Sequence, residues 1–218
     1  MKIHIITIFP ESFDSFFSTS IISRAKDNNL FWYELYKLND FSDNNTKRAD
    51  DKAYGMHWQV ISAEPLSKAI EYIFSKIWKK IDVIYMSPSW ELLNQKRVEF
   101  FYDKFKDKDF IIICGHYEWI DQRIIDLYVD YQISIWEYVL TSWELASQVF
   151  LDSILRHIPW VLWNKDSLEE DSFSKKFERK KEYPVYTRPS SFMWLDVPDI
   201  LLSGNHKKIE DWKNNNLT

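Results

Sequence analysis

Glycine is the residue that this chain lacks most: its 218 residues include three glycines, against eleven tryptophans. An average soluble domain of this length would have about 7% glycine, or roughly fifteen residues. Turns with positive φ need glycine, which an indole side chain replaces poorly. Several tryptophans nevertheless stand at turns, such as Trp160 directly after Pro159. We hypothesise that many of them are glycines in the cell, written as tryptophan because a UGA codon was read with the wrong genetic code. The alternative is an aromatic-rich core.

Cysteine and long apolar runs are also scarce. The single cysteine, Cys114, excludes an internal disulfide and fits a reducing compartment. It closes an apolar strand, so a buried, inert thiol is the expected state. No stretch approaches the roughly twenty apolar residues of a membrane span. The apolar start, residues 1–10, is too short for a signal peptide and predicts a first strand, so we expect a cytoplasmic protein with no membrane partner.

Several common functional motifs are missing as well. The sequence has no phosphate-binding Walker A loop, no dinucleotide-binding glycine fingerprint, no paired-cysteine zinc motif and no histidine pair at metal spacing. We therefore expect no metal-ligating residues of these kinds. The net charge of −5 argues against non-specific coating of nucleic acid, although a local basic patch is compatible with RNA binding.

What is present is an alternation of short apolar runs with helical patterns. The predicted strands are Ile3–Phe9, Phe31–Leu38, Asp82–Met86, Phe110–Cys114 and Gln132–Ile135. The predicted helices are Glu11–Asn28, Glu64–Lys79, Gln95–Phe105, Ile120–Tyr128 and Glu144–His157, and the polar stretch Asn39–Asp51 is predicted to be a loop. This alternation is typical of an α/β domain with a parallel sheet.

The composition changes after residue 158. We expect a main domain over residues 1–160, a linker over 161–172, and a smaller domain over 173–218. The last segment is first basic, then rich in proline, and ends with a short helical pattern near Lys207–Lys213.

Three segments at predicted strand ends could form one site. They cover residues 87–90, 114–119 and 134–144. Ligands in open α/β sheets bind beyond the carboxyl ends of the strands, so these loops could converge on one pocket. Taken singly, each is also what an ordinary strand-to-helix connection looks like.

Reading glycine at positions 119, 136, 143, 160 and 163 gives these loops a recognisable form. Segments 114–121, 134–145 and 158–163 then resemble the bacterial tRNA (guanine-N1)-methyltransferase family, TrmD. Further matching segments run in order along nearly the whole chain: residues 8–11, 50–55, 170–173, 186–189 and 201–206.

The resemblance implies a methyltransferase of the SPOUT class. Its expected fold is a parallel α/β sheet with a C-terminal trefoil knot, plus a small, mostly helical C-terminal domain. Such an enzyme moves a methyl group from S-adenosylmethionine to N1 of the guanosine on the 3′ side of the tRNA anticodon. The family works as a homodimer whose active site is completed across the subunit interface.

The resemblance also assigns a cofactor site to the three loops. Backbone groups there would bind the adenine and ribose, which requires close approach of the ligand to the main chain. Glu118 is in addition a candidate aid to a magnesium ion. The residues assigned to the cofactor are Met86, Ser87, Pro88, Gly115, Tyr117, Glu118, Ile135, Trp136, Glu137, Tyr138, Val139, Leu140, Ser142 and Trp143.

Two catalytic roles follow from the resemblance. Asp171 matches the general base that removes the proton from N1 of guanine; the alternative is that Asp171 or Ser172 caps a following helix. Arg156 matches the residue that stabilises negative charge at O6; the alternative is a surface arginine on the predicted Glu144–His157 helix.

A basic cluster is the expected tRNA contact, because phosphate contacts position RNA. The alternative is a solvated helix face. The residues are Lys175, Lys176, Arg179, Lys180, Lys181 and Arg188.

The chain departs from the family pattern at several places. Ser142 replaces the first glycine of a pair, the glycine-rich stretch after Tyr54 is reduced, and the C-terminal domain is short. Trp212 matches a family tryptophan and is expected to be genuine, whereas Trp32 is assigned to neither reading. Two competing functions therefore stay open: a catalytically impaired RNA-binding homologue, and a SPOUT methyltransferase acting on another RNA position.

Overall fold

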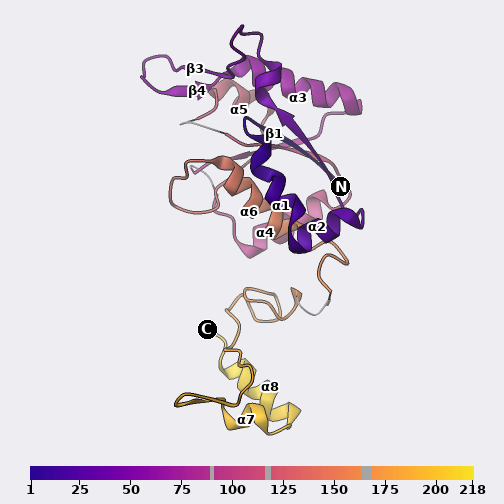
Figure 1. The fold of residues 1–218 in the computed structure, drawn as a ribbon, viewed down its shortest axis with the longest axis vertical. Coiled ribbons are helices and arrows are strands. Elements are labelled where there is room, and N and C mark those ends of the chain that lie inside the picture. Colours follow the sequence, from indigo (N-terminus) through magenta and orange to yellow (C-terminus); the bar gives the residue numbers. More distant parts are fainter. Residues whose placement is uncertain (89–90, 116–118, 164–167) are drawn as a thin grey trace. The chain divides into compact units, whose positions relative to one another are not determined.

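The computed structural model describes residues 1–88, 91–115, 119–163 and 168–218. The chain separates into two compact units, Met1–Trp163 and Asn164–Thr218, each with its own internal contacts. Each unit is described by itself, and Figure 1 shows the course of the chain through both.

The first unit is built on a five-stranded parallel sheet in the order β2-β1-β6-β5-β7. This confirms the predicted α/β class. The predicted strands are all present, with ends that shift by up to two residues. Their observed bounds are β1 Lys2–Thr7, β2 Trp32–Lys37, β5 Asp82–Met86, β6 Phe110–Ile113 and β7 Tyr131–Ile133.

Helices cover both faces of this sheet, as Figure 1 shows. Alternate residues of one strand enter different cores: Phe110 and Ile112 pack on one face, Ile111 and Ile113 on the other. Strands buried on both faces read as continuous apolar runs rather than as alternating ones. One face carries α1 Asp14–Ser18, α2 Ser20–Asp27, α4 Gln95–Phe105 and α6 Trp143–Leu155; the other carries α3 Ala63–Ile77 and α5 Gln122–Tyr128.

The predicted first helix, Glu11–Asn28, is wrong as a single helix. The segment forms a 3-10 helix, η1 Pro10–Phe13, and then α1 and α2, which are separated at Thr19 with φ −115° and ψ 140°. Three hydroxyl residues in a row, Ser18–Ser20, stand at this break. Their side chains compete for backbone hydrogen bonds and so weaken a continuous helix.

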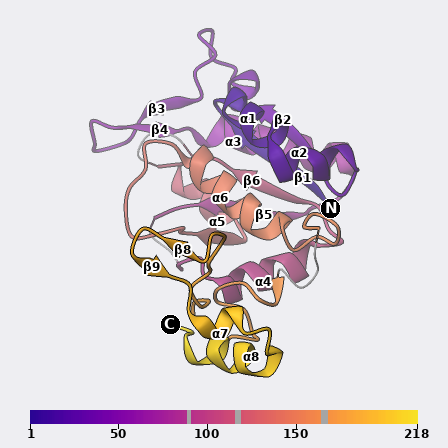
Figure 2. The same ribbon diagram turned by 60° about the horizontal axis from the view of Figure 1, so that its bottom comes forward.

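The predicted loop Asn39–Asp51 also contains regular structure. It includes most of a 3-10 helix, η2 Leu38–Phe41, and the start of β3 Asp50–Lys52. β3 pairs with β4 Gln59–Ile61 as an antiparallel hairpin, which extends from the body of the first unit in both views (Figures 1 and 2). Strands of three residues are too short to show a readable period, which is why the sequence did not predict them.

The second unit is small. It holds a hairpin, β8 Ser191–Phe192 with β9 Leu195–Asp196, and two helices, α7 Asp199–Leu202 and α8 His206–Asn215. The helix predicted near Lys207–Lys213 is thus confirmed. Trp212 of α8 packs beside Tyr183 and Tyr186, with ring centroids 6.3 and 6.4 Å away. No helix among the described residues is both long and apolar enough to cross a membrane.

Candidate functional site

Three loops leave the same edge of the parallel sheet. The register aligns Tyr85 of β5 with Ile113 of β6, and Met86 with Ile133 of β7. Because neighbouring parallel strands end together, the segments after β5, β6 and β7 begin side by side. This is the edge at which the sequence predicted a ligand site.

The loop after β5 is tied to the end of β7. The backbone N–H of Ser87 donates to the carbonyl of Ile133 (2.9 Å), and that of Leu93 donates to the carbonyl of Ser134 (2.7 Å). Ser87 is buried, whereas Pro88 is half-buried. The two loops are therefore held in register by their main chains, beyond the ends of the strands.

The loop after β6 begins with Gly115, which is tightly enclosed. A Cβ atom at this position would lie 3.0 Å from Trp143 Cδ1 and 3.2 Å from Tyr85 Cε2. Close packing therefore favours glycine here, because a larger residue would require the Trp143 or Tyr85 ring to shift. The predicted cofactor contacts Tyr117 and Glu118 lie outside the described residues.

The β7–α6 loop spans residues 134–142, and its centre, residues 136–139, is exposed. Its first turn is held by the Ser134 hydroxyl, which donates to the carbonyl of Trp136 (2.8 Å). Trp136, Tyr138 and Val139 expose 56%, 51% and 82% of their surface. Ile135 and Leu140, near the two ends of the loop, pack against the core. The predicted cofactor residues of this loop thus form an arch with anchored ends and an open centre.

A buried polar cluster lies where this arch returns to the sheet, and the sequence did not predict it. Glu144 is 1% exposed and accepts hydrogen bonds from Thr7 Oγ1 (2.6 Å) and Ser142 Oγ (2.9 Å). The Cys114 thiol is buried as predicted; its pKa is raised by burial and, secondarily, by the charge of Glu144. The sequence signal for Glu144 was its place at the end of the candidate segment 134–144, directly after the predicted cofactor residues Ser142 and Trp143.

The two predicted catalytic residues belong to different units. Arg156 forms the C-cap of α6 in the first unit and is half-buried. Asp171 is half-buried in the second unit, where its carbonyl accepts from the N–H of Ser174 (3.1 Å). The alternative that Asp171 or Ser172 caps a helix is wrong, because turns rather than a helix follow at residues 172–180.

The basic cluster is not a helix face either, since residues 173–181 form turns. Lys176 is paired with Glu170 (2.7 Å), and this hydrogen bond lowers the pKa of the Glu170 carboxyl. Arg179 donates to the carbonyl of Phe173 (2.9 Å). The exposed members are Lys175, Lys176, Lys180 and Lys181.

Arg188 lies apart from this cluster in sequence and lines an open cavity of about 870 Å³ in the second unit, together with Tyr186 and Leu201. No group of three or more His, Cys, Asp or Glu residues suitable for a metal ion occurs within the described ranges.

Comparison with known proteins assigns the chain to a family. The sequence model described as tRNA (Guanine-1)-methyltransferase TrmD matches residues 1–218. The chain belongs to the TrmD family. The tRNA (guanine-N(1)-)-methyltransferase of Clostridioides difficile (strain 630) is 42% identical over 215 residues, 98% of this chain and 90% of that protein.

Further relatives agree. The tRNA (guanine-N(1)-)-methyltransferase of Borrelia hermsii is 43% identical, covering 98% of this chain and 86% of that protein. Among solved structures, the tRNA (m1G37) methyltransferase from Aquifex aeolicus matches with a TM-score of 0.79 and 30% identity, covering 98% of this chain and 88% of that one. The resemblance drawn from the sequence motifs is thus confirmed, and the first unit is the parallel α/β part of a TrmD fold.

Proposed function

We propose that this TrmD-family chain transfers a methyl group from S-adenosylmethionine to N1 of the tRNA guanosine on the 3′ side of the anticodon. The observation that carries the proposal is the convergence of the loops after β5, β6 and β7 at one sheet edge, in a chain whose whole length matches the family. S-adenosylmethionine supplies the methyl group as a sulfonium that an unprotonated ring nitrogen can attack.

The three loops suit a nucleoside ligand in two respects. Gly115 has no side chain to keep a ligand from its main chain, and the centre of the β7–α6 loop is exposed. Met86–Pro88, Gly115 and Ile135–Leu140 would hold adenine and ribose, with Ser142 at the end of the loop. The indole of Trp143, however, lies on Gly115 and narrows this space.

The chemistry requires one proton to be moved. Neutral guanine carries a proton on N1, and its removal leaves negative charge that spreads to O6. In our proposal the Asp171 carboxylate accepts the proton and the Arg156 guanidinium stabilises the charge at O6. The family completes its active site across the subunit interface of a homodimer, and we propose the same assembly for this chain.

The second unit would bind the tRNA. Lys175, Lys180 and Lys181 are exposed and suited to phosphate contacts. Lys176, Arg179 and Arg188 complete the proposed surface, and Glu118 remains the proposed aid to a magnesium ion. The proposed compartment is the cytoplasm, where tRNA is found.

Methylation of tRNA transcripts tests the function. The purified chain and labelled S-adenosylmethionine are incubated with a tRNA that has guanosine at position 37 and with the same tRNA carrying adenosine there. We expect methyl transfer to the first only, on N1 of that guanosine. Transfer at another nucleotide would favour a different SPOUT activity. Binding of tRNA with no methyl transfer at any enzyme concentration would favour the impaired RNA-binding homologue, which the position of Trp143 against Gly115 supports.

A further inference from the structure

Glu144 is a buried acidic residue held by hydroxyl groups. It is the second residue of α6, and its two carboxylate oxygens accept from Thr7 and Ser142 at 2.6 and 2.9 Å. Within the part of the chain that the structure describes, no lysine or arginine forms an ion pair with it. Burial of a carboxylate is costly unless its oxygens are satisfied by well-placed donors.

The position of Glu144 joins separate parts of the site. Thr7 is the last residue of β1, an interior strand of the sheet, and Ser142 is the last residue of the β7–α6 loop. Thr7 is itself fixed, because its hydroxyl accepts from the backbone N–H of Phe9 (3.0 Å). The Glu144 carboxylate thus connects Ser142, at the end of the loop, to Thr7, at the end of β1. A carboxylate is favoured at this position because Glu144 lies in the first turn of α6.

We propose that Glu144 is a positioning residue, which holds the β7–α6 loop in its binding conformation through Ser142 and Thr7. The proposal rests on the cofactor site of the proposed function. Ser142 stands where the family pattern has glycine, so the Ser142–Glu144 bond is an additional tie in this chain. In this role Glu144 acts through Ser142 and Thr7 rather than on the reacting atoms.

Hydrogen exchange of the loop amides tests the proposal directly. In Thr7→Val and Ser142→Ala, we expect the amides of residues 135–142 to exchange about five- to tenfold faster, because each variant removes a charge-assisted hydrogen bond. Thr7→Ser should restore the wild-type rate. Ser153→Ala removes another hydroxyl of α6, one that donates only to the carbonyl of Phe150 in its own helix, and should leave the loop unchanged.

Unchanged loop exchange in both Thr7→Val and Ser142→Ala would overturn the proposal. Equal acceleration in β2 and α4 would also overturn it, because that result indicates general destabilisation. As a second readout, the Kd for S-adenosylmethionine should rise about fivefold while KM for tRNA stays constant. Failure of the wild-type chain to methylate tRNA would contradict the proposed function, whereas loop exchange would still decide the role of Glu144.

A second inference concerns the tryptophans and rests on different observations. Of the ten that the structure describes, only Trp143 is buried, which contradicts the aromatic-core alternative. Tryptophan is on average among the well-buried residues. Eight are exposed: Trp32, Trp58, Trp78, Trp119, Trp136, Trp160, Trp163 and Trp194.

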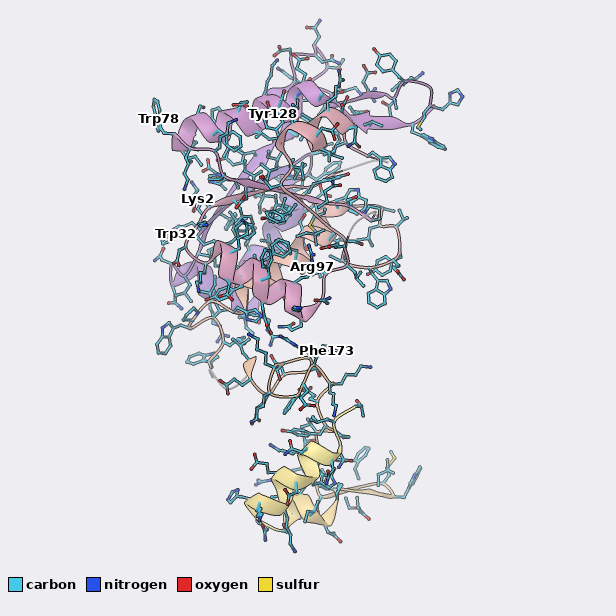
Figure 3. The ribbon with its side chains drawn as sticks, turned by 180° about the vertical axis from the view of Figure 1, so that it is seen from behind. Lys2, Trp32, Trp78, Arg97, Tyr128 and Phe173 are labelled. Atoms are coloured by element: carbon cyan, nitrogen blue, oxygen red, sulfur yellow. The ribbon has the colours of Figure 1, made fainter. Side chains whose placement is uncertain are left out.

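Two of these exposed tryptophans occupy backbone conformations that favour glycine. Trp78 ends α3 with φ 56° and ψ 30°, and the next N–H, from Lys79, donates to the carbonyl of Phe74 (3.2 Å). This is the Schellman arrangement, whose left-handed position is usually glycine. The Trp78 side chain projects from the end of α3 and is 94% exposed (Figure 3). Trp160 follows Pro159 with φ 74° and is 74% exposed.

We infer that residues 78 and 160 are glycine in the protein that the source cell makes, with UGA codons read as glycine. The test is the codon at each position, together with tandem mass spectrometry of peptides from the source cell. Glycine at 78 and 160, with tryptophan at the packed position 212, is the expected result. UGG codons and tryptophan-containing peptides at 78 and 160 would overturn the inference.

Discussion

The indole of Trp143 lies against the backbone of Gly115, so that a Cβ atom on the glycine would stand 3.0 Å from Trp143 Cδ1. The two residues come from different loops of the proposed cofactor site: Gly115 lies in the loop after β6, and Trp143 is the first residue of α6, directly after the β7–α6 loop. The side chain at position 143 therefore helps to set the space available to a cofactor beside Gly115, and replacing it should change cofactor binding.

Trp143→Gly should tighten S-adenosylmethionine binding while lowering the stability of the free protein. The indole is 5% exposed, so its removal leaves a cavity that costs about 3–5 kcal/mol. A ligand that occupies part of this space recovers stability by binding only the folded state. Calorimetry should therefore show a lower Tm without cofactor and a larger cofactor-induced rise than in the unsubstituted chain. An unchanged Kd would mean that the indole does not restrict the site.

Asp171→Asn should abolish most methyl transfer and keep cofactor binding. An amide cannot take the N1 proton, and loss of a general base typically lowers the rate by about 10²–10⁴-fold. Single-turnover methylation measures the effect, and Glu169→Gln, in the same acidic run, is the matched control. Near-normal turnover in Asp171→Asn would remove this residue from the base role.

Arg156→Ala should likewise slow the chemical step by about 10²-fold, because it removes the cation proposed to stabilise charge at O6. Cofactor affinity should stay within a factor of two. Arg123→Ala is the control, since Arg123 is an exposed arginine of the same unit that pairs locally with Asp121 (2.7 Å). Equal losses in the two variants would point to a general charge effect.

Alanine at Lys175, Lys180 or Lys181 should weaken tRNA binding and reduce its salt dependence. Removing one phosphate-binding cation lowers the slope of log K against log salt by about 0.9 or less. Lys176→Ala should have a smaller effect, because its ammonium group is already paired with Glu170 (2.7 Å). Filter binding over a range of salt concentrations gives both quantities. Four identical slopes, equal to that of the unsubstituted chain, would exclude this segment from the tRNA surface.

Acid should destabilise the first unit through Glu34. Burial opposes ionisation of this carboxyl, but hydrogen bonds from Lys2 (2.7 Å) and Lys76 outweigh it and lower the pKa from 4.5 to about 2. A lowered pKa in the folded state adds stability that is present above pH 4.5 and is lost as the pH falls towards 2. Glu34→Gln should therefore flatten the fall of unfolding free energy in this window, as urea titrations at several pH values would reveal. An unaltered pH profile would show that exposure to solvent screens these pairs.

Much of the first unit was predictable because its signals are strong. The strands of the sheet are buried on both faces, so they appear as apolar runs such as Phe110–Ile113. α4, Gln95–Phe105, was predicted to the residue from its helical pattern, and in the structure Asn94 caps it by accepting from the N–H of Arg97 (3.1 Å). The break at Thr19 was missed because it depends on local competition between polar groups, and the β3–β4 hairpin was missed because its strands are too short to show a periodic pattern.

The candidate site was predictable only in part. Motif resemblance located the three loops, and the parallel register explains why they meet. The contacts of Glu144 with Thr7 and of Trp143 with Gly115 join residues distant in the chain, so no local sequence pattern could predict them. The roles of Asp171 and Arg156 came from the resemblance alone and stay predictions.

The place of β1 in the sheet has a consequence for synthesis on the ribosome. β1 is made first, yet it lies between β2 and β6, and β6 begins at Phe110. The Thr7–Glu144 bond forms only after the chain has been made as far as α6. A nascent chain that has emerged only through α4 therefore exposes the edge of β1 that later pairs with β6, and such edges invite pairing with other chains. Cofactor binding to a nascent chain would then show that the whole first unit has left the ribosome and that its sheet is complete.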